Sequence, residues 1–255
     1  MQSEHEQKNS LKTRVKEDLL DYIKQQDLST FTKLPEEEIL ADILGVNQDT
    51  LQVILDEMVS DGILFYKAGE GLSVNKEFFD ISVSFNPAMY YVDMIRNSGY
   101  KPRSEIVYQN VEPASEEVAE KLHIAVGSPV VTCVKFFYAD DRLCVMVEDY
   151  ASQELVGVID AELMDACSDS MFYYVYCKTG RKILWDKTEI DIVESKDLAF
   201  LHERLMRDGM EDKAYLLLKS VNYDQENRVT LYAKGHIDTS ILKYSQIRKK
   251  GISYD

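Results

Sequence analysis

Apolar residues recur at helical spacing in three successive segments near the start of the chain. In the first, residues 11–26, leucine, valine and isoleucine form a stripe three and four residues apart. The second begins at Pro35, which suits the first turn of a helix, and ends at Gly45. The third begins at Asn47 or Asp49, either of which can cap a helix, and ends before Gly62. The spacing predicts three helices.

A different pattern follows the third helix. Residues 63–74, "ILFYKAGEGLSV", read as two short strands around the glycines Gly69 and Gly71. Three helices followed by a hairpin is the order of a winged helix, with Gly45 in the turn between its second and third helices. We therefore predict a winged helix-turn-helix over residues 1–75.

From residue 103 onward the chain alternates strand-like and helix-like segments. Six segments rich in β-branched and aromatic residues are predicted strands, among them "PVVTCVKFFYA" and "RLCVMVEDYA". Three helical segments lie between them, "ASEEVAEKL", "SMFYYVYCKTG" and "SKDLAFLHERLM". Since "YADDR" and "YDQENR" look like hairpin connections, we predict a mostly antiparallel sheet in an α+β domain over residues 103–255. A linker with a short helix, from about Ala88 to Asn97, occupies residues 76–102.

Charge argues against a nucleic-acid partner. The chain carries a net charge of −16, whereas a DNA-binding domain is normally basic or has a basic face. The predicted winged helix is no exception, because residues 1–77 hold 8 lysines and arginines against 16 aspartates and glutamates.

Few other classes of site find support in the sequence. The four cysteines have no CxxC spacing and the histidines share no spacing, so we expect buried thiols, no metal site and no cofactor. No apolar run is long enough to span a membrane, and residues 1–10 lack the apolar stretch of a signal peptide. A cytoplasmic location is expected.

The residues of the first domain resemble a known family. The segment "KLPEEEILADILGVNQDTLQVILDEMVSDGILFYKAGEGLSV" is similar to the winged helix of GntR-family bacterial transcriptional regulators. The second domain resembles the UTRA effector-binding domain found in the same family, through "SGYKPRS", "VAEKLHIAVGSPVV", "FFYADDRLCVMVEDY" and "SMFYYVYCKTG". The resemblance implies a chorismate-lyase-like fold for that domain. It also implies an effector-responsive regulator, a homodimer that binds a palindromic operator in double-stranded DNA.

The departures from the family pattern fall on the surface that would meet DNA. The residue after Leu-Pro is usually serine and is Glu36 here, and two arginines of the recognition helix are replaced by Gln48 and Gln52. Each missing cation removes a phosphate or guanine contact, although amides and hydroxyls can still read base edges. The candidate DNA-binding residues are Lys33, Glu36, Asn47, Gln48, Thr50, Gln52, Lys67, Gly69 and Gly71.

The effector site departs from the family as well. Its Arg-x-Arg, which contacts an anionic group of the ligand, is matched here by Lys135 and Phe137. Because a phenylalanine cannot replace a bidentate guanidinium, we expect an effector less anionic than a sugar phosphate. The candidate effector-binding residues are Arg103, Ser104, Lys135, Phe137, Glu148, Ser170 and Phe172.

Purely structural roles remain open for many of these residues. Asn47 and Ser170 could simply cap helices, the lysines could be solvated charges, and the phenylalanines could belong to the core. Two other functions also remain open. The chain could be a regulator-derived ligand-binding or protein-interaction module with weakened DNA binding, or a small enzyme on the lyase-like fold. No catalytic constellation supports the enzyme.

Overall fold

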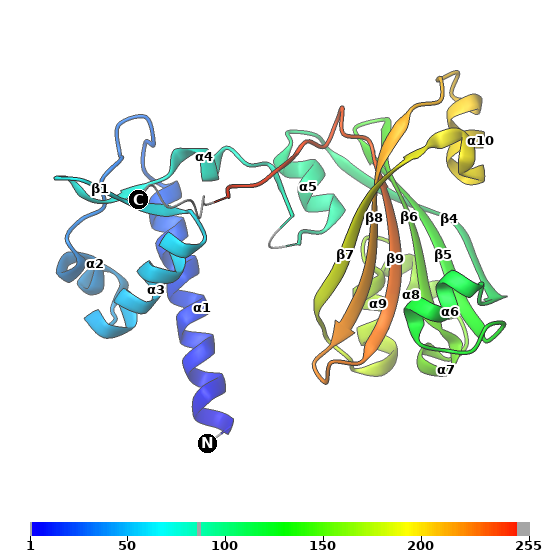
Figure 1. Cartoon of the computed structure of the whole chain (residues 1–255), viewed down its shortest axis with the longest axis horizontal. Helices are drawn as coiled ribbons and strands as arrows, with labels where there is room; N and C mark the ends of the chain where they lie inside the picture. Colours follow the sequence, from blue (N-terminus) through cyan, green and yellow to red (C-terminus); the bar gives the residue numbers. More distant parts are fainter. Residues whose placement is uncertain (1, 86–87, 249–255) are drawn as a thin grey trace, which may run out of the picture. The chain divides into compact units, whose positions relative to one another are not determined.

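The computed structural model describes residues 2–85 and 88–248, with side chains from Leu11 onward. Within these residues two compact units form, one from residues 2–82 with residues 245–248 and one from residues 83–244 (Figure 1).

The first unit is the predicted winged helix. Helices α1 (Gln2–Lys24), α2 (Glu37–Leu44) and α3 (Gln48–Ser60) precede a hairpin of β1 (Leu64–Lys67) and β2 (Gly71–Val74). Apolar side chains four residues apart on α1, Val15, Leu19 and Ile23, are fully buried in its core. The three predicted helices and the hairpin are thus confirmed. A short helix that the sequence did not suggest, α4 (Lys76–Phe79), follows the hairpin.

The second unit is built on a six-stranded sheet in the order β4-β5-β6-β9-β8-β7, in which every neighbouring pair is antiparallel. The predicted antiparallel sheet is therefore confirmed. Its strands are β4 (Pro102–Pro113), β5 (Pro129–Ala139), β6 (Arg142–Ser152), β7 (Ile183–Glu194), β8 (Ala214–Asp224) and β9 (Val229–Ile237). A two-stranded sheet of β3 (Val83–Ser84) and β10 (Tyr244–Ser245) lies where the chain enters and leaves this unit.

Helices cover both faces of the six-stranded sheet. One face is here called the α5 face. On it α5 (Tyr91–Asn97) packs on one apolar cluster, the α5 cluster. A second apolar cluster on this face, the α9 cluster, is covered by α7 (Gln153–Val156), α8 (Ala161–Ala166) and α9 (Met171–Thr179). On the opposite face, the α10 face, lie α6 (Glu116–Leu122) and α10 (Ala199–Arg207), the latter after a 3-10 turn at Ser195–Asp197. In the view of Figure 1, α8 and α9 lie behind the sheet and α6 in front.

The two faces explain the composition of the central strands. Side chains alternate between the faces of a strand, so Val131, Cys133, Lys135 and Phe137 of β5 lie on the α5 face, and the residues between them lie on the α10 face. Because both faces are covered, β5 is buried along nearly its whole length. The predicted helix over residues 88–97 begins only at Tyr91, and α7 and α8 were not predicted.

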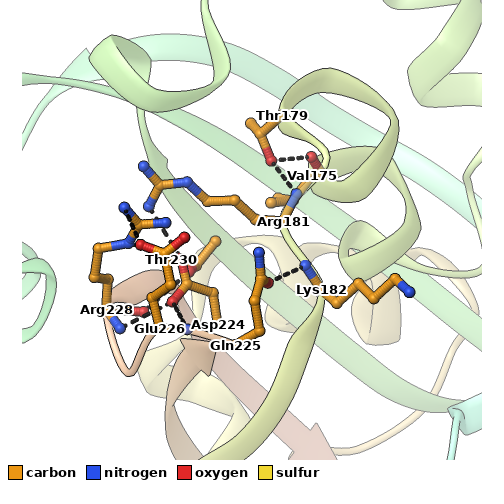
Figure 2. A network of polar contacts seen from close by, with 9 residues as sticks. All are labelled: Val175, Thr179, Arg181, Lys182, Asp224, Gln225, Glu226, Arg228 and Thr230. Atoms are coloured by element: carbon orange, nitrogen blue, oxygen red, sulfur yellow. Dashed lines mark hydrogen bonds and ion pairs between the residues drawn. The ribbon is translucent and has the colours of Figure 1, made fainter. Parts of the chain in front are cut away.

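A polar network around Asp224 holds the turn between β8 and β9 against the start of β7 (Figure 2). The Asp224 carboxylate is fully buried and accepts hydrogen bonds from the backbone N–H groups of Glu226 and Arg228, at 2.8 and 3.0 Å. It also accepts from the side chains of Arg181 and Arg228, at 3.2 and 3.1 Å. Burial alone would raise the pKa of this carboxyl, but the backbone bonds and Arg228 outweigh it, so its pKa lies below the ordinary value.

We predict that Asp224→Asn lowers the free energy of unfolding by about 1–3 kcal/mol at neutral pH, because buried donors lose a charged acceptor. A carboxyl whose pKa is lowered by folding stabilises the fold above its unfolded pKa of about 4, and that contribution is lost as the pH falls through the folded pKa. Urea unfolding should therefore show a gap between the two proteins that narrows in acid. A gap that stays constant below pH about 4, or an equal loss in the exposed variant Glu211→Gln, would contradict this assignment.

Candidate DNA-binding surface and effector site

The helix-turn-helix is shaped by one glycine and one cap. Gly45 ends α2 in the left-handed conformation, with φ 64°, and donates its N–H to the carbonyls of Ala41 and Asp42. Glycine adopts this conformation without the steric cost of a Cβ. The Asn47 side chain then accepts a hydrogen bond from the Thr50 N–H at 2.8 Å and so caps α3. Its cap role, one of the two readings of Asn47, is thereby established.

The remaining polar candidates lie along the first turns of α3. Gln48 is exposed, whereas Thr50 and Gln52 are half-buried. The Gln52 amide donates to Asp56 Oδ1 at 3.2 Å, so it would have to turn from that carboxylate to read a base.

Both candidate lysines of this unit are in ion pairs with nearby glutamates. Lys33 Nζ lies 3.9 Å from Glu36 Oε1, and Lys67 Nζ lies 2.7 Å from Glu70 Oε1. All four side chains are exposed, so each pair contributes only about 0–1 kcal/mol and can be exchanged for a phosphate. The wing turn between β1 and β2 has positive φ at Gly69 and Gly71, 78° and 89°.

On the α5 face of the second unit, two charged residues are buried where the two apolar clusters meet. Lys135 is the cross-strand neighbour of Ile106, which packs on the α9 cluster, and of Val147, which belongs to the α5 cluster. Its ammonium lies 3.0 Å from Asp149 Oδ2, and both side chains are 3–4% exposed. Burial raises the pKa of Asp149, and the charge of Lys135 opposes that rise.

Four other candidate residues lie on the same face. Ser104 donates a hydrogen bond to Asp169 Oδ1 at 2.6 Å and lies 3.2 Å from the Ser168 hydroxyl. Ser170 accepts from the Tyr173 N–H and caps α9. Phe172 packs on the α9 cluster, 6.3 Å between ring centres from Tyr90, and Phe137 packs on the α5 cluster beside Tyr91.

Two candidates are not brought to this face. Arg103 stacks on the Tyr138 ring at 3.7 Å on the α10 face, beside a hollow of about 340 Å³ under α10. Glu148 also points to the α10 face, where its carboxylate lies 3.3 Å from Nε2 of the buried His236. Both side chains therefore point away from Lys135, because each lies one strand position from a residue that points to the α5 face.

Models of two known families match the chain in the same order as the two units. The model of bacterial regulatory proteins of the gntR family matches residues 11–74, and the UTRA domain model matches residues 97–242, more than half of the chain. The chain belongs to the GntR family of transcriptional regulators with a UTRA domain. This is a family of regulators and not of enzymes.

Relatives agree with this membership. The regulator is 27% identical over 155 residues to YurK of Bacillus subtilis, an uncharacterised HTH-type transcriptional regulator, a match covering 61% of this chain and 63% of YurK. It is 26% identical over 128 residues to the HTH-type transcriptional regulator GgaR of Escherichia coli, half of each chain. The chain thus matches less than two thirds of the length of either relative.

Solved structures share the fold. The possible transcriptional regulator YydK of Bacillus subtilis superposes with a TM-score of 0.71 at 18% identity, covering 94% of this chain and 99% of YydK. PhnF of Mycobacterium smegmatis gives a TM-score of 0.53 at 16% identity, covering 92% and 99%.

The sequence did not single out Asp149, Gln109 or Tyr91, which lie on the α5 face of the regulator. Asp149 could have been found from strand alternation, since it is an even number of positions from the buried Val147 and Val145. Gln109 follows a bulge in β4 at residues 106–108, and a bulge cannot be located from alternation alone. Tyr91 belongs to α5, and the packing of this helix on the sheet is tertiary structure that the sequence pattern does not predict.

Other side chains with reactive or ligating potential do not gather in the part of the chain that the structure describes. No group of three or more His, Cys, Asp or Glu residues could hold a metal ion there. Cys133, Cys144 and Cys167 are buried free thiols, whereas Cys177 is exposed. Among the described helices, none is long and apolar enough to cross a membrane.

We predict that Lys135→Met lowers the free energy of unfolding by about 3–5 kcal/mol, because it leaves the Asp149 charge buried without its partner. The double variant Lys135→Met/Asp149→Leu should recover to within about 1 kcal/mol of the wild type, since apolar residues replace both charges. Urea unfolding measures both, with the exposed Lys101→Met as control. A double variant no more stable than the single one would contradict the assignment.

Proposed function

We propose that the regulator is a cytoplasmic homodimer that binds a palindromic operator through its winged helices and a small-molecule effector through its UTRA domain. Residues 1–75 would form the DNA-binding domain, residues 76–102 the linker and residues 103–255 the effector domain. The observation that carries the proposal is the pairing, in one chain, of a capped recognition helix with exposed polar residues and a polar site enclosed within the second domain.

DNA recognition in this proposal depends on amides more than on cations. Asn47 and Gln48 are exposed at the start of α3 and can hydrogen-bond to adenine edges in the major groove. Lys33 and Lys67 would contact phosphates after releasing Glu36 and Glu70. Each phosphate contact contributes about 0.9 to the slope of log K against log salt. A winged helix with two such lysines therefore binds DNA with an affinity that depends only weakly on the salt concentration.

Dimerisation is proposed to use β7, one of the two edge strands of the six-stranded sheet. Among the described residues β7 pairs on one side only, with β8, yet Leu184, Ile190 and Ile192 on it are 58–70% exposed. A long apolar edge strand is a template for pairing with another chain. Antiparallel pairing about a two-fold axis at Thr188 would place Lys187 opposite the partner's Glu189 and Leu184 opposite the partner's Ile192. Opposite charges and apolar residues then face each other along the strand.

Small-molecule control would follow from the two states that this dimer can adopt. An effector can shift the balance between them only through its different affinity for each. Binding of the effector is proposed to change the spacing of the two heads, which fit two half-sites about one helical turn apart in one state only.

A second candidate is a regulator-derived module that has lost DNA affinity. The acidic first unit and the ion-paired state of Lys33 and Lys67 favour it. Ligand-dependent self-association without any operator preference would identify this function.

Fluorescence anisotropy against the promoter DNA of the regulator's own operon, beside a scrambled duplex, tests the proposal. We expect operator preference and a salt slope of roughly −4 for the dimer, from four lysines. Gln48→Arg should tighten binding to both duplexes and steepen the slope by about 2, whereas Gln153→Arg in the second unit should change neither. Equal binding of both duplexes at low salt would refute the proposal.

For the dimer, we expect Leu184→Lys/Ile192→Lys to yield a monomer, because positions 184 and 192 face each other across the paired strands and the variant sets lysine against lysine at both. Sedimentation equilibrium measures the mass. The matched control is Met206→Lys, at an apolar side chain of α10 that is 46% exposed, and it should remain dimeric. A double variant that stays dimeric would exclude β7 as the interface.

A further inference from the structure

One row of side chains crosses the α5 face beside the Lys135–Asp149 pair. Gln109, Cys133, Asp149 and Ala233 are successive cross-strand neighbours on β4, β5, β6 and β9. All four therefore point to the same side of the sheet. Its two polar members, Gln109 and Asp149, lie where the α5 cluster gives way to the α9 cluster.

Two acceptors in this row are buried without a hydrogen bond. Among the described residues, neither Gln109 Oε1 nor Asp149 Oδ2 has a hydrogen-bonding partner. The contact of Asp149 Oδ2 is the ion pair with the Lys135 ammonium, 3.0 Å away. A buried acceptor without a donor costs about 1–3 kcal/mol. The raised pKa of Asp149 points the same way, since it shows that Lys135 does not fully offset the burial of the carboxylate.

Two small residues of β9, Ala233 and Gly235, lie at this row and next to it. Ala233 is half-exposed although β9 lies inside the sheet. Two residues further, a Cβ on Gly235 would lie 2.1 Å from the Tyr91 hydroxyl oxygen, so Tyr91 occupies the space that a side chain would take there. The Tyr91 hydroxyl thus covers Gly235, whereas Ala233, the residue of β9 opposite Asp149, stays partly exposed.

The charges beside this row are balanced before any ligand binds. Lys135 and Asp149 neutralise each other, and Phe137 supplies no charge. A phosphate drawn to Lys135 would meet the Asp149 carboxylate at close range in a poorly solvated site, where like charges repel strongly. A ligand that donates hydrogen bonds would instead satisfy both free acceptors and leave the ion pair intact.

We propose that Asp149 and Gln109 recognise the effector, and that the effector is a compound with an ammonium group or several hydroxyls and no phosphate or carboxylate. In this assignment Lys135 is the counter-ion of Asp149 and not the ligand-binding charge. The inference rests on the proposed function only in taking this domain as the effector site.

A thermal-unfolding screen tests the assignment with small metabolites in four groups: amines and amino sugars, neutral polyols, sugar phosphates, and carboxylates. We expect compounds that raise the unfolding temperature to come from the first two groups. Hits are then titrated by calorimetry against Asp149→Asn and Gln109→Leu. Each variant should weaken binding about tenfold or more, because Gln109→Leu removes an acceptor and Asp149→Asn removes the charge and replaces one acceptor oxygen by a donor.

Glu148→Gln is the matched control, because it changes a carboxylate on the same strand that points to the α10 face. It should bind the hits as the wild type does. If Asp149→Asn unfolds, Gln109→Leu still decides the matter, since it leaves the ion pair in place. A sugar phosphate or carboxylate as the strongest hit, with binding lost in Lys135→Met and retained in Gln109→Leu, would overturn the assignment.

The screen is independent of DNA binding, so the two proposals can fail separately. Loss of operator preference together with amine or polyol hits would refute the regulator function and leave the ligand class standing. Operator preference without any stabilising compound would refute recognition by Asp149 and Gln109 and leave the regulator function standing.

Discussion

The buried ion pair of Lys135 and Asp149 constrains the second domain more than any other interaction. Two unit charges lie between apolar clusters in the middle of a sheet, 3.0 Å apart and almost wholly excluded from solvent. Neither charge is tolerable there alone, so the two must stay together and the site around them is close to neutral. The Gln109 side-chain oxygen beside the pair is buried without a hydrogen bond, so what is missing there is a hydrogen-bond donor.

The fold of the first unit does not depend on the charges that would bind DNA. The fold of the winged helix depends on buried leucine, isoleucine and methionine side chains and on two local devices, the left-handed Gly45 and the Asn47 cap. None of these requires a positive surface. The helix-turn-helix geometry is therefore preserved while the two candidate DNA-binding lysines, Lys33 and Lys67, are paired with glutamates. Fold and affinity for a polyanion are separate properties of this unit.

Much of the fold could be predicted from the sequence because the spacing of the apolar residues agreed with the positions of the capping and turn residues. The four-residue steps of α1 and α3, the glycines of the wing and the six β-rich segments all correspond to observed elements. The four-residue helix α7 and the six-residue helix α8 were missed because so few residues carry no clear period.

The candidate sites could be predicted less well. Lys135, Phe137, Ser104, Ser170 and Phe172 do lie on one face, but Arg103 and Glu148 do not, since a strand position one residue away points to the other face. Asp149, adjacent in sequence to Glu148, is the carboxylate that meets Lys135. Strand pairing and register decide which of these two acids points to the α5 face. Pairing and register depend in turn on a bulge and on strand partners that are distant in sequence.

In the proposed regulator, a donor ligand held by Asp149 and Gln109 controls DNA binding. The most direct measurement is operator affinity by anisotropy with and without a saturating ligand of the amine or polyol group. We expect a change in operator Kd of about 5- to 150-fold in the wild type and in Glu148→Gln, and little change in Gln109→Leu at the same ligand concentration. An unchanged Kd in the wild type, or an equal change in Gln109→Leu, would contradict it.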